Sequence, residues 1–394
     1  MRSQFNRLLA ASTLSNLGDG VVVTAFPLLA ASISSSPQAV AGMTAVATLP
    51  WLLFGLPAGV VVDRVNRVRL MWMVDLARAA AVAALGLLIL NDNTNLLSLY
   101  AVVFVLGVAE TLFDSAAMAV VPGVVESESL ERANGRLFAG QLTANQFVGP
   151  PLGALLFGVA TSLPPLVDAV TFLVSAVLLT GLRVHKETVV SERRSLMVEL
   201  REGLSWVLQN HNIRTLAIGA GVINLAHTGA MAVLVLFATV VLGLPEIGYG
   251  ALFVLAAVGA LAGSLTASRV ANRFGRRPTV LGSVAAMAAS LVAIGVTRSV
   301  VATGLGMVVM GVGAEFWNVV AVSYHQTATP DRLLGRVMSA YRFIAYGSFP
   351  LGALLGGWLA TELGLPATFV VGGALIAMLF LFMLWVLGDL DSRP

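Results

Sequence analysis

The segment GPPLGALLFG (149–158) recurs with few changes as SFPLGALLGG (348–357) in the second half of the chain. Three shorter matches keep the same order and nearly the same spacing. They pair SNLGDG (15–20) with INLAHTG (223–229), DRVNR (63–67) with NRFGR (272–276), and NGR (134–136) with LGR (334–336). Four matches in one order indicate that the chain consists of two repeated halves.

The composition places both halves in a membrane. The 394 residues are 58% hydrophobic and only 11% charged, with a mean hydropathy of +0.90, whereas soluble globular chains carry about 25% charged residues. A soluble fold of this length would need far more polar surface to cover its core. No cysteine is present, which excludes disulfides, thiolate metal sites and cysteine nucleophiles.

Twelve apolar runs have about the 20-residue length that a helix needs to cross a bilayer. They lack the alternation of polar and apolar side chains that is typical of membrane β-barrels. The sequence therefore predicts an all-α integral membrane fold, with twelve transmembrane helices in two pseudo-symmetric six-helix bundles. The runs are 8–32, 38–62, 70–90, 97–121, 137–160, 165–183, 214–241, 247–271, 279–297, 300–324, 338–361 and 366–388.

The longest polar stretch separates the sixth run from the seventh. It predicts an N-terminal bundle at 1–183, a cytoplasmic linker at 184–213 and a C-terminal bundle at 214–394. Within the linker, SLMVELREGLSWVLQ (195–209) has apolar residues at helical spacing, which predicts an amphipathic helix on the cytoplasmic face. A plain charged linker is the alternative.

The basic residues predict the orientation of the chain. With both termini in the cytoplasm, the outer loops hold only Arg298, and nearly all other basic residues lie inside, as the positive-inside rule requires. Such charge orients a membrane chain, so we expect no nucleic-acid partner. The short basic start, MRSQFNR (1–7), precedes a run as long as a full span, which indicates an uncleaved first helix.

Between the second and third runs, GVVVDRVNRVRL (59–70) resembles the signature loop of the major facilitator superfamily. Asn66 replaces the second glycine of that loop and is expected to take the same left-handed turn. The second-half copy, SRVANRFGRR (268–277), keeps the glycine as Gly275 but has Asn272 in place of the acidic residue. The residues that fit the signature are Gly59, Asp63, Arg64, Arg67 and Arg69.

In the fifth run, GQLTANQFVGPPLG (140–153) is similar to the signature of the drug:proton antiporters within that superfamily. Two further segments, 121–136 and 168–179, are most similar to its macrolide and siderophore exporters. The resemblance covers essentially the whole chain and implies export by alternating access, with the first, fourth, seventh and tenth helices lining a central cavity. The gating residues that we expect are Gly59, Asp63, Arg64, Arg67, Arg78, Gly149, Pro150, Gly153 and Arg342.

These gating residues have physical reasons to matter. Glycines such as Gly149 and Gly153 allow close helix packing, and Pro150 bends its helix. The alternative is that these residues serve packing alone and do not indicate the direction of transport. By resemblance, Asp63 braces the cytoplasmic gate. Arg342 lies near the start of the eleventh run, from which its side chain can snorkel to the interface.

Ionisable residues inside the spans are functional candidates, because a charge at the bilayer centre costs about 3 kcal/mol. Asp19 lies near the middle of the first run, where the resemblance implies that it faces the cavity and can exchange a proton. Glu110 and Asp114 lie one turn apart on one helix face, and such proximity disfavours joint ionisation. We expect these three residues to couple protons. Asp114 as part of the inner gate and Asp19 as a packing residue are the alternatives.

The substrate-binding candidates come from the same cavity-lining helices. His227 is the counterpart of Asp19, and Glu315 stands beside Trp317, so that an acid and an aromatic ring can bind lipophilic cations. A packing role for Trp317 and a helix-to-helix hydrogen bond for His227 are the alternatives. The full set is Asn16, Asp19, Glu110, Phe113, Asn224, His227, Glu315, Trp317 and Asn318.

Two further charged groups are expected to be structural. Asp75 and Arg78, one turn apart near the cytoplasmic start of the third helix, can neutralise each other. Asp168 is expected to cap the outer end of the sixth helix.

No enzyme signature occurs in the chain. The histidines at 185, 211, 227 and 325 lack metal-ligand spacing, and no phosphate-binding loop ending in Gly-Lys-Ser/Thr is present. We therefore expect no metal, no cofactor and no enzymatic activity. The expected protein is a monomeric, proton-coupled exporter of lipophilic, cationic or neutral drugs in a bacterial inner membrane. Export of a siderophore or lipid, or proton-coupled nutrient import, remains open; a membrane sensor or enzyme is disfavoured.

Overall fold

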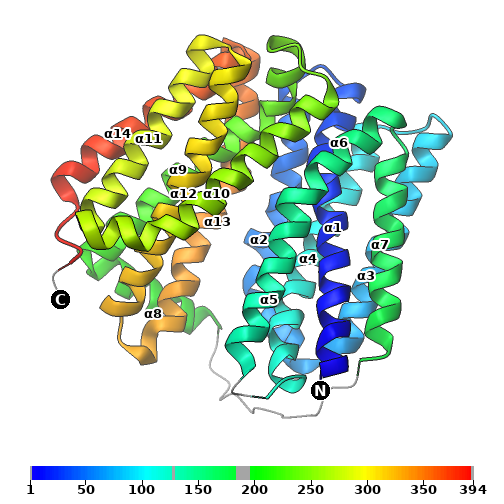
Figure 1. Ribbon diagram of the computed structural model, residues 1–394, viewed down its shortest axis with the longest axis horizontal. Helices are drawn as coiled ribbons and strands as arrows, with labels where there is room; N and C mark the ends of the chain where they lie inside the picture. Colours follow the sequence, from blue (N-terminus) through cyan, green and yellow to red (C-terminus); the bar gives the residue numbers. More distant parts are fainter. Residues whose placement is uncertain (1, 127–128, 183–195, 392–394) are drawn as a thin grey trace. The chain divides into compact units, whose positions relative to one another are not determined.

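The computed structural model describes residues 2–126, 129–182 and 196–391, which are almost entirely helical (Figure 1). No strand occurs among these described residues, so the predicted all-α architecture is confirmed. Within the same residues, eleven helices are long and apolar enough to cross a membrane. The predicted run 137–160 is covered instead by three consecutive helical segments.

The helices follow the predicted runs, with ends that differ by a few residues. The first six runs contain α1 (Arg2–Ile33), α2 (Pro37–Arg64), α3 (Arg67–Leu90), α4 (Leu96–Val120), η1 (Val121–Gly123), α5 (Leu130–Leu142), η3 (Thr143–Val148), α6 (Gly149–Val159) and α7 (Leu163–Thr180). The remaining chain contains α8 (Leu196–Gln209), α9 (His211–Leu236), η4 (Phe237–Val241), α10 (Glu246–Phe274), α11 (Arg276–Thr297), α12 (Val300–Ala328), α13 (Asp331–Leu363) and α14 (Leu365–Val386).

The chain divides into two compact units. The first unit contains the described residues within Met1–Ser35, Val46–Glu192 and Leu244–Val254. The second unit contains those within Ser36–Ala45, Arg193–Gly243 and Leu255–Pro394. Helices α2 and α10 therefore each contribute residues to both units.

A π-helical segment interrupts the fifth predicted span just before its two prolines. Pro150 and Pro151 have no backbone N–H, so they cannot continue the hydrogen-bond pattern of an α-helix. The backbone N–H of Gly149 reaches instead to the carbonyl of Ala144, five residues back. This wider turn forms η3 between α5 and α6, which explains why the span is not one continuous α-helix.

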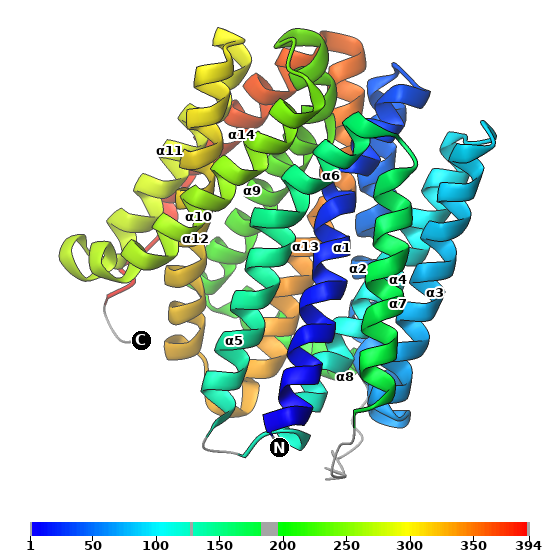
Figure 2. The same cartoon turned by 45° about the vertical axis from the view of Figure 1, so that its right-hand side comes forward.

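The repeated GPPLGALLFG and SFPLGALLGG segments make the same kind of helix contact in each unit. In the first unit, Gly149 and Gly153 lie against α1, and a side chain at Gly149 would begin 2.5 Å from the Cα of Gly20. Figure 2 shows α1 alongside α5, α6 and α7. In the second unit, Gly352 and Gly356 of α13 lie equally close to the α9 backbone at Leu225 and Gly229.

Asparagine side chains cap the N-termini of several helices. Asn66, Asn95 and Asn210 each accept the backbone N–H three residues further on, at the starts of α3, α4 and α9. The predicted left-handed turn at Asn66 is wrong: its φ is −69°, because a residue that caps a helix from its side chain adopts an extended backbone. Gly275, at the same place in the repeat, has a φ of +89°, which glycine tolerates best.

Helix α8 occupies the stretch for which the sequence predicts an amphipathic helix. It packs against α13 within the second unit. Gly203 lets it approach the backbone at Arg336 closely, and the Arg336 guanidinium forms an ion pair with Glu202. Val207 is buried. The apolar side of α8 is therefore covered at least partly by protein.

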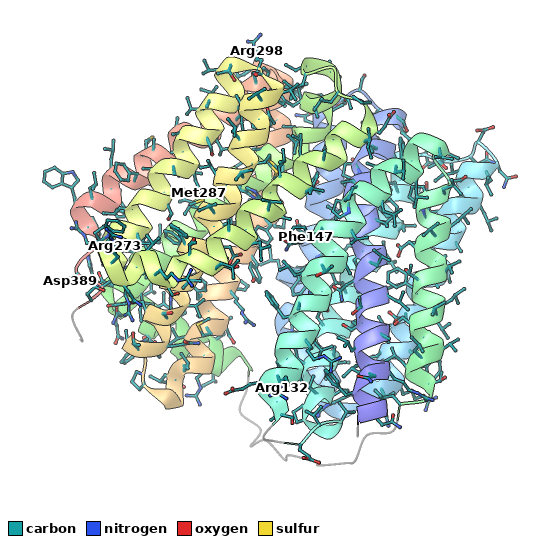
Figure 3. The ribbon with its side chains drawn as sticks, in the orientation of Figure 1. Arg132, Phe147, Arg273, Met287, Arg298 and Asp389 are labelled. Atoms are coloured by element: carbon teal, nitrogen blue, oxygen red, sulfur yellow. The ribbon has the colours of Figure 1, made fainter. Side chains whose placement is uncertain are left out.

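Basic residues lie near both ends of α11 (Figure 3). Arg273 and Asp389 lie near the beginning of this helix, and Arg298 forms its opposite end with a left-handed backbone. At the beginning, the Asp391 carboxylate accepts the backbone N–H of Arg276 at 3.1 Å, and Arg277 donates to the carbonyls of Leu384 and Leu387. The segment after α14 is thereby fixed to the start of α11.

Candidate functional site

One buried guanidinium, that of Arg78 on α3, organises the polar interior of the first unit. Its Nη1 lies 3.7 Å from Oδ2 of Asp19 on α1 and 3.9 Å from Oδ1 of Asp75, one turn earlier on α3. The side chains of Arg78 and Asp75 are 1% and 0% exposed, whereas that of Asp19 is 16% exposed. Asp19 is therefore the accessible carboxylate of this group.

Asp75 is held by two serine hydroxyls from other helices. Ser175 of α7 donates a 2.6 Å hydrogen bond to Oδ2 of Asp75. Ser15 of α1 accepts a 3.2 Å hydrogen bond from Arg78 Nη1 and donates a longer one, 3.5 Å, to Oδ1 of Asp75. A hydroxyl can do both, since it has one donor and two lone pairs. Helices α1, α3 and α7 are thus joined through Asp75 and Arg78.

Two aromatic rings flank the Arg78 guanidinium. Phe113 of α4 and Phe172 of α7 have ring centroids 5.4 and 5.1 Å from its Cζ, a distance at which the ring face attracts a cation. The Nε and Nη2 atoms of Arg78 are buried with no hydrogen-bond partner in the described structure. The guanidinium is therefore fixed by charge and ring contacts while part of its donor capacity stays unused.

The other carboxylates of the first unit surround the same cation. Glu110 and Asp114 on α4 interact electrostatically with Arg78, as Asp168 on α7 does. Glu110 also accepts a hydrogen bond from the Trp51 side chain. Helices α1, α3, α4 and α7 together bring several acidic groups around one basic group.

The expected cap at Asp168 and the expected position of Asp75 and Arg78 are wrong, although Asp75 and Arg78 do form the expected ion pair. Asp168 does not cap its helix, since α7 begins at Leu163 after Ser162; Asp168 is fully buried, and its Oδ1 accepts from Thr171. Gly18 on α1 makes room for this carboxylate, because a side chain there would collide with it. Asp75 and Arg78 lie in the middle of α3, not near its cytoplasmic start, because the helix already begins at Arg67.

The predicted substrate residues of the first unit differ in accessibility. Asp19 and Glu110 are partly exposed. Phe113 is 1% exposed against Arg78, and Asn16 is buried with its side-chain amide donating to the carbonyl of Ser12. In this structure the two carboxylates are thus accessible, whereas Phe113 and Asn16 are not.

In the second unit, Glu315 and Trp317 do not form the acid–aromatic pair suggested by the sequence. Residues two apart on a helix face different directions. The Trp317 ring packs against Gly219 of α9, and its N–H donates to the Tyr341 hydroxyl at 3.3 Å. Glu315 lies instead against Gly263 of α10.

The remaining candidates of the second unit have mixed environments. Asn224 donates to the carbonyl of Ala345 on α13, at 2.9 Å. His227 is half-buried and Asn318 is exposed. In the residues that the structure describes, no three His, Asp or Glu side chains are arranged to hold a metal ion.

The expected gating residues lie in different environments. Arg67 donates to the carbonyl of Ala119, near the end of α4, at 2.9 Å, and Arg64 is exposed. Gly59 lies within α2, and the side chain of Asp63 lies outside the described residues. Arg342 is exposed but lies well inside α13, since that helix begins at Asp331 and not at 338.

Sequence reasoning missed the residues that complete the Arg78 site. Ser15, Ser175, Phe172 and Trp51 each come from a different part of the chain, and none forms a motif with Arg78. The only local signal was the pairing of Asp75 with Arg78 at helical spacing. Their partners depend on which helices touch, which the sequence pattern does not specify.

The described helices include eleven that are long and apolar enough to cross a membrane, and those of the first unit bring several carboxylates around Arg78. A model of the family described as "Transmembrane secretion effector" matches residues 1–393. The chain belongs to this family, and through it to the major facilitator superfamily. It is a multi-pass protein of a bacterial membrane that transports small molecules and is not an enzyme.

Relatives of the chain include named efflux proteins. The multidrug efflux pump Tap of Mycolicibacterium fortuitum is 28% identical over 385 residues, covering 92% of this chain and 90% of that protein. Macrolide efflux protein A of Streptococcus pyogenes is 23% identical over 388 residues, covering 95% and 93%. Both similarities extend over nearly the full length of each protein.

Solved transporter structures share the fold. A mutant of the nucleoside transporter NupG superposes with a TM-score of 0.80 at 10% identity, covering 98% of this chain and 100% of that one. A bacterial homologue of the iron transporter ferroportin gives a TM-score of 0.76 at 16% identity, covering 97% and 98%. At such identities the likeness concerns the fold alone.

Proposed function

We propose that this transporter exports lipophilic, drug-like compounds in exchange for protons that enter the cell. The observation that carries the proposal is Asp19, a partly exposed carboxylate in the middle of α1 and 3.7 Å from a buried guanidinium. Intramembrane carboxylates are costly and mark proton or substrate pathways. The similarity to the multidrug efflux pump Tap and to macrolide efflux protein A supports the direction of transport and the kind of cargo.

The coupling requires only that one site binds a proton and a substrate in competition. Ionised Asp19 attracts a cationic compound, and protonation of Asp19 releases it. Each ligand favours a different state of an alternating-access cycle, so the gradient of one drives the other. Glu110 and Asp114 take part through their charge near Arg78.

Substrate contacts are proposed for the partly or fully exposed members of the predicted set. In the first unit these are Asp19 and Glu110; in the second unit they are Asn224, His227, Glu315 and Asn318. We also propose that both termini are cytoplasmic and that the protein resides in the inner membrane. The signature loop at 59–70 and the α1–α6 contact then act in gating.

Inverted membrane vesicles test the proposal with ethidium, a fluorescent lipophilic cation. Acid inside the vesicle corresponds to protons outside the cell, so we expect this gradient to drive ethidium into vesicles that carry the intact protein. Asp19→Asn removes the ionisable group with little change of shape, and we expect it to abolish the gradient-driven component. Asp92→Asn is the matched control, because Asp92 lies in an exposed turn where asparagine is equally suited to a positive φ.

Three results would contradict the proposal in different ways. Full gradient-driven uptake by Asp19→Asn would exclude Asp19 as the coupling group. Ethidium uptake driven only by a gradient with the acid side outside the vesicle would indicate proton-coupled import, as for a nutrient. If the intact protein moved neither ethidium nor a macrolide, export of a siderophore or lipid would be favoured.

A further inference from the structure

Arg78 is shared between two carboxylates that are held very differently. Asp75 is fully buried, lies one turn away on the same helix and is fixed by Ser175 and Ser15. Asp19 is on another helix, is 16% exposed and contacts the guanidinium only at ion-pair distance, 3.7 Å. One partner of the cation is therefore permanent, and the other is free to change its ionisation or its ligand.

We propose that Arg78 and Asp75 form a fixed charge pair that positions Asp19 and determines the pH at which it gains and loses its proton. This inference rests on the proposed function, in which Asp19 is the proton-coupling carboxylate. It gives Arg78 a positioning role in the proton step, whereas the sequence suggested a gate residue or a purely structural pair.

The energetics of burial support this division of roles. A buried cation without a partner is strongly unfavourable, whereas a buried pair with satisfied hydrogen bonds persists. Asp75 supplies that partner, so Arg78 stays charged when Asp19 is protonated or occupied by a cationic substrate. The Phe113 and Phe172 rings, with centroids 5.4 and 5.1 Å from Cζ of Arg78, also favour the guanidinium staying in place when Asp19 changes its partner.

The unused donors of Arg78 are consistent with a changing partner. Its Nε and Nη2 are buried and make no hydrogen bond in the described structure. A guanidinium serving only to pin helices together would be expected to use its donors fully, since an unsatisfied buried donor costs about 1–3 kcal/mol. Spare donors beside a partly exposed carboxylate instead allow a second, stronger arrangement with ionised Asp19.

Among the described residues of the elements packed against α1, a small set of charged groups lies around Asp19. Helix α3 contributes Asp75 and Arg78, helix α4 contributes Glu110 and Asp114, and helix α7 contributes Asp168. The η3 and α6 segments that pack on α1 contain no ionisable residue, and the charged residues of α5 (Glu131, Arg132 and Arg136) are exposed. Arg78 is the single positive charge in this set, so the direction in which its removal shifts the proton affinity of Asp19 can be predicted.

Proton release on ethidium binding provides the test, measured with a pH-indicator dye on purified protein in detergent. The measured quantity is the pH at which release is half-maximal. Arg78→Gln removes the favourable charge next to Asp19, so we expect this midpoint to rise by about 1 pH unit. Asp75→Asn leaves the charge of Arg78 uncompensated, so we expect the midpoint to fall.

Two more variants separate charge from shape. Arg78→Lys keeps the charge and is expected to keep the midpoint close to that of the intact protein. The double variant Asp75→Asn with Arg78→Gln removes equal and opposite charges, so we expect it to return toward the original midpoint. Arg201→Gln, in the exposed part of α8, is the matched control and should leave the midpoint unchanged.

The outcomes distinguish this inference from the proposed function. If Asp19→Asn still releases protons fully, the coupling role of Asp19 fails. If Asp19→Asn abolishes release while Arg78→Gln and Asp75→Asn do not shift the midpoint in opposite directions, the positioning role is overturned and the coupling role stands. If Arg78→Gln does not fold, the positioning role is still tested by the other two variants. It requires a lower pH midpoint with Asp75→Asn and an unchanged midpoint with Arg78→Lys.

Discussion

Ser175 shows how much a single hydroxyl contributes to the charged interior of the first unit. Its 2.6 Å hydrogen bond ends on Asp75, a carboxylate with no exposure. Hydrogen bonds to charged groups are stronger than neutral ones. Because this bond joins α7 to α3, its loss affects both the charge pair and the contact between the two helices.

Ser175→Ala is expected to destabilise the protein by about 1–3 kcal/mol, because a buried charged acceptor loses a donor. The shift is measured as a lower thermal transition of the protein in detergent. Ser264→Ala is the control: its hydroxyl only bonds back to Leu261 on an exposed part of α10, so about 0.5 kcal/mol or less is expected. Equal shifts for the two variants would show that the Ser175 bond adds nothing.

At the level of elements, the crossing of α1 and α6 depends on the absence of side chains. A methyl group at Gly153 would lie 2.9 Å from the carbonyl carbon of Val21 and 2.7 Å from Oγ1 of Thr24. Thr24 also donates a 2.7 Å hydrogen bond to the carbonyl of Pro150. Small residues allow such close backbone approach, which is a major source of helix association in membranes.

Gly153→Ala is expected to destabilise this crossing by about 1–3 kcal/mol, since the helices must separate to admit the methyl group. Gly158→Ala, five residues further along the same helix, meets nothing within 4 Å, so it should be neutral or slightly stabilising because alanine favours a helix. Thermal unfolding of the two purified variants makes the comparison. A stable Gly153→Ala protein with full transport would exclude a tight crossing.

At the scale of the whole molecule, the distribution of basic residues makes a prediction about sidedness that the fold alone does not. Arg273, in the last turn of α10, lies just before the start of α11, and Arg298 follows the other end of α11 (Figure 3). The positive-inside rule places the arginine-rich end in the cytoplasm. Since successive spans alternate in direction, fixing one loop fixes all the others.

The chain has no cysteine, so each introduced cysteine is a unique label. We expect a membrane-impermeant maleimide to label Asn93→Cys and Thr161→Cys in intact cells, because both exposed positions are in predicted outer loops. Asn134→Cys, also exposed, should react only after the cells are opened. The reverse pattern would place both termini outside.

The sequence by itself determined the all-helical membrane fold, the order of its apolar runs and the repeated motifs of the two halves. These follow from hydrophobic runs and local motifs, because a helix in lipid satisfies its own backbone hydrogen bonds and its length is set by the bilayer. It also singled out Asp19, Glu110 and Asp114 as costly intramembrane charges. The helix Leu196–Gln209 was visible from the spacing of its apolar residues alone.

Only the tertiary structure decided which side chains meet. Ser175 reaches Asp75 across 100 residues of sequence, and Phe172 reaches Arg78 from another helix, because neighbouring helices bring together residues that share no sequence pattern. For the same reason, Glu315 and Trp317 do not pair, since each faces a different helix. Asp168 is buried against Gly18, where a helix cap was expected. Contacts within a helix follow from the helical repeat, whereas contacts between helices depend on rotation and crossing, which packing of whole surfaces sets.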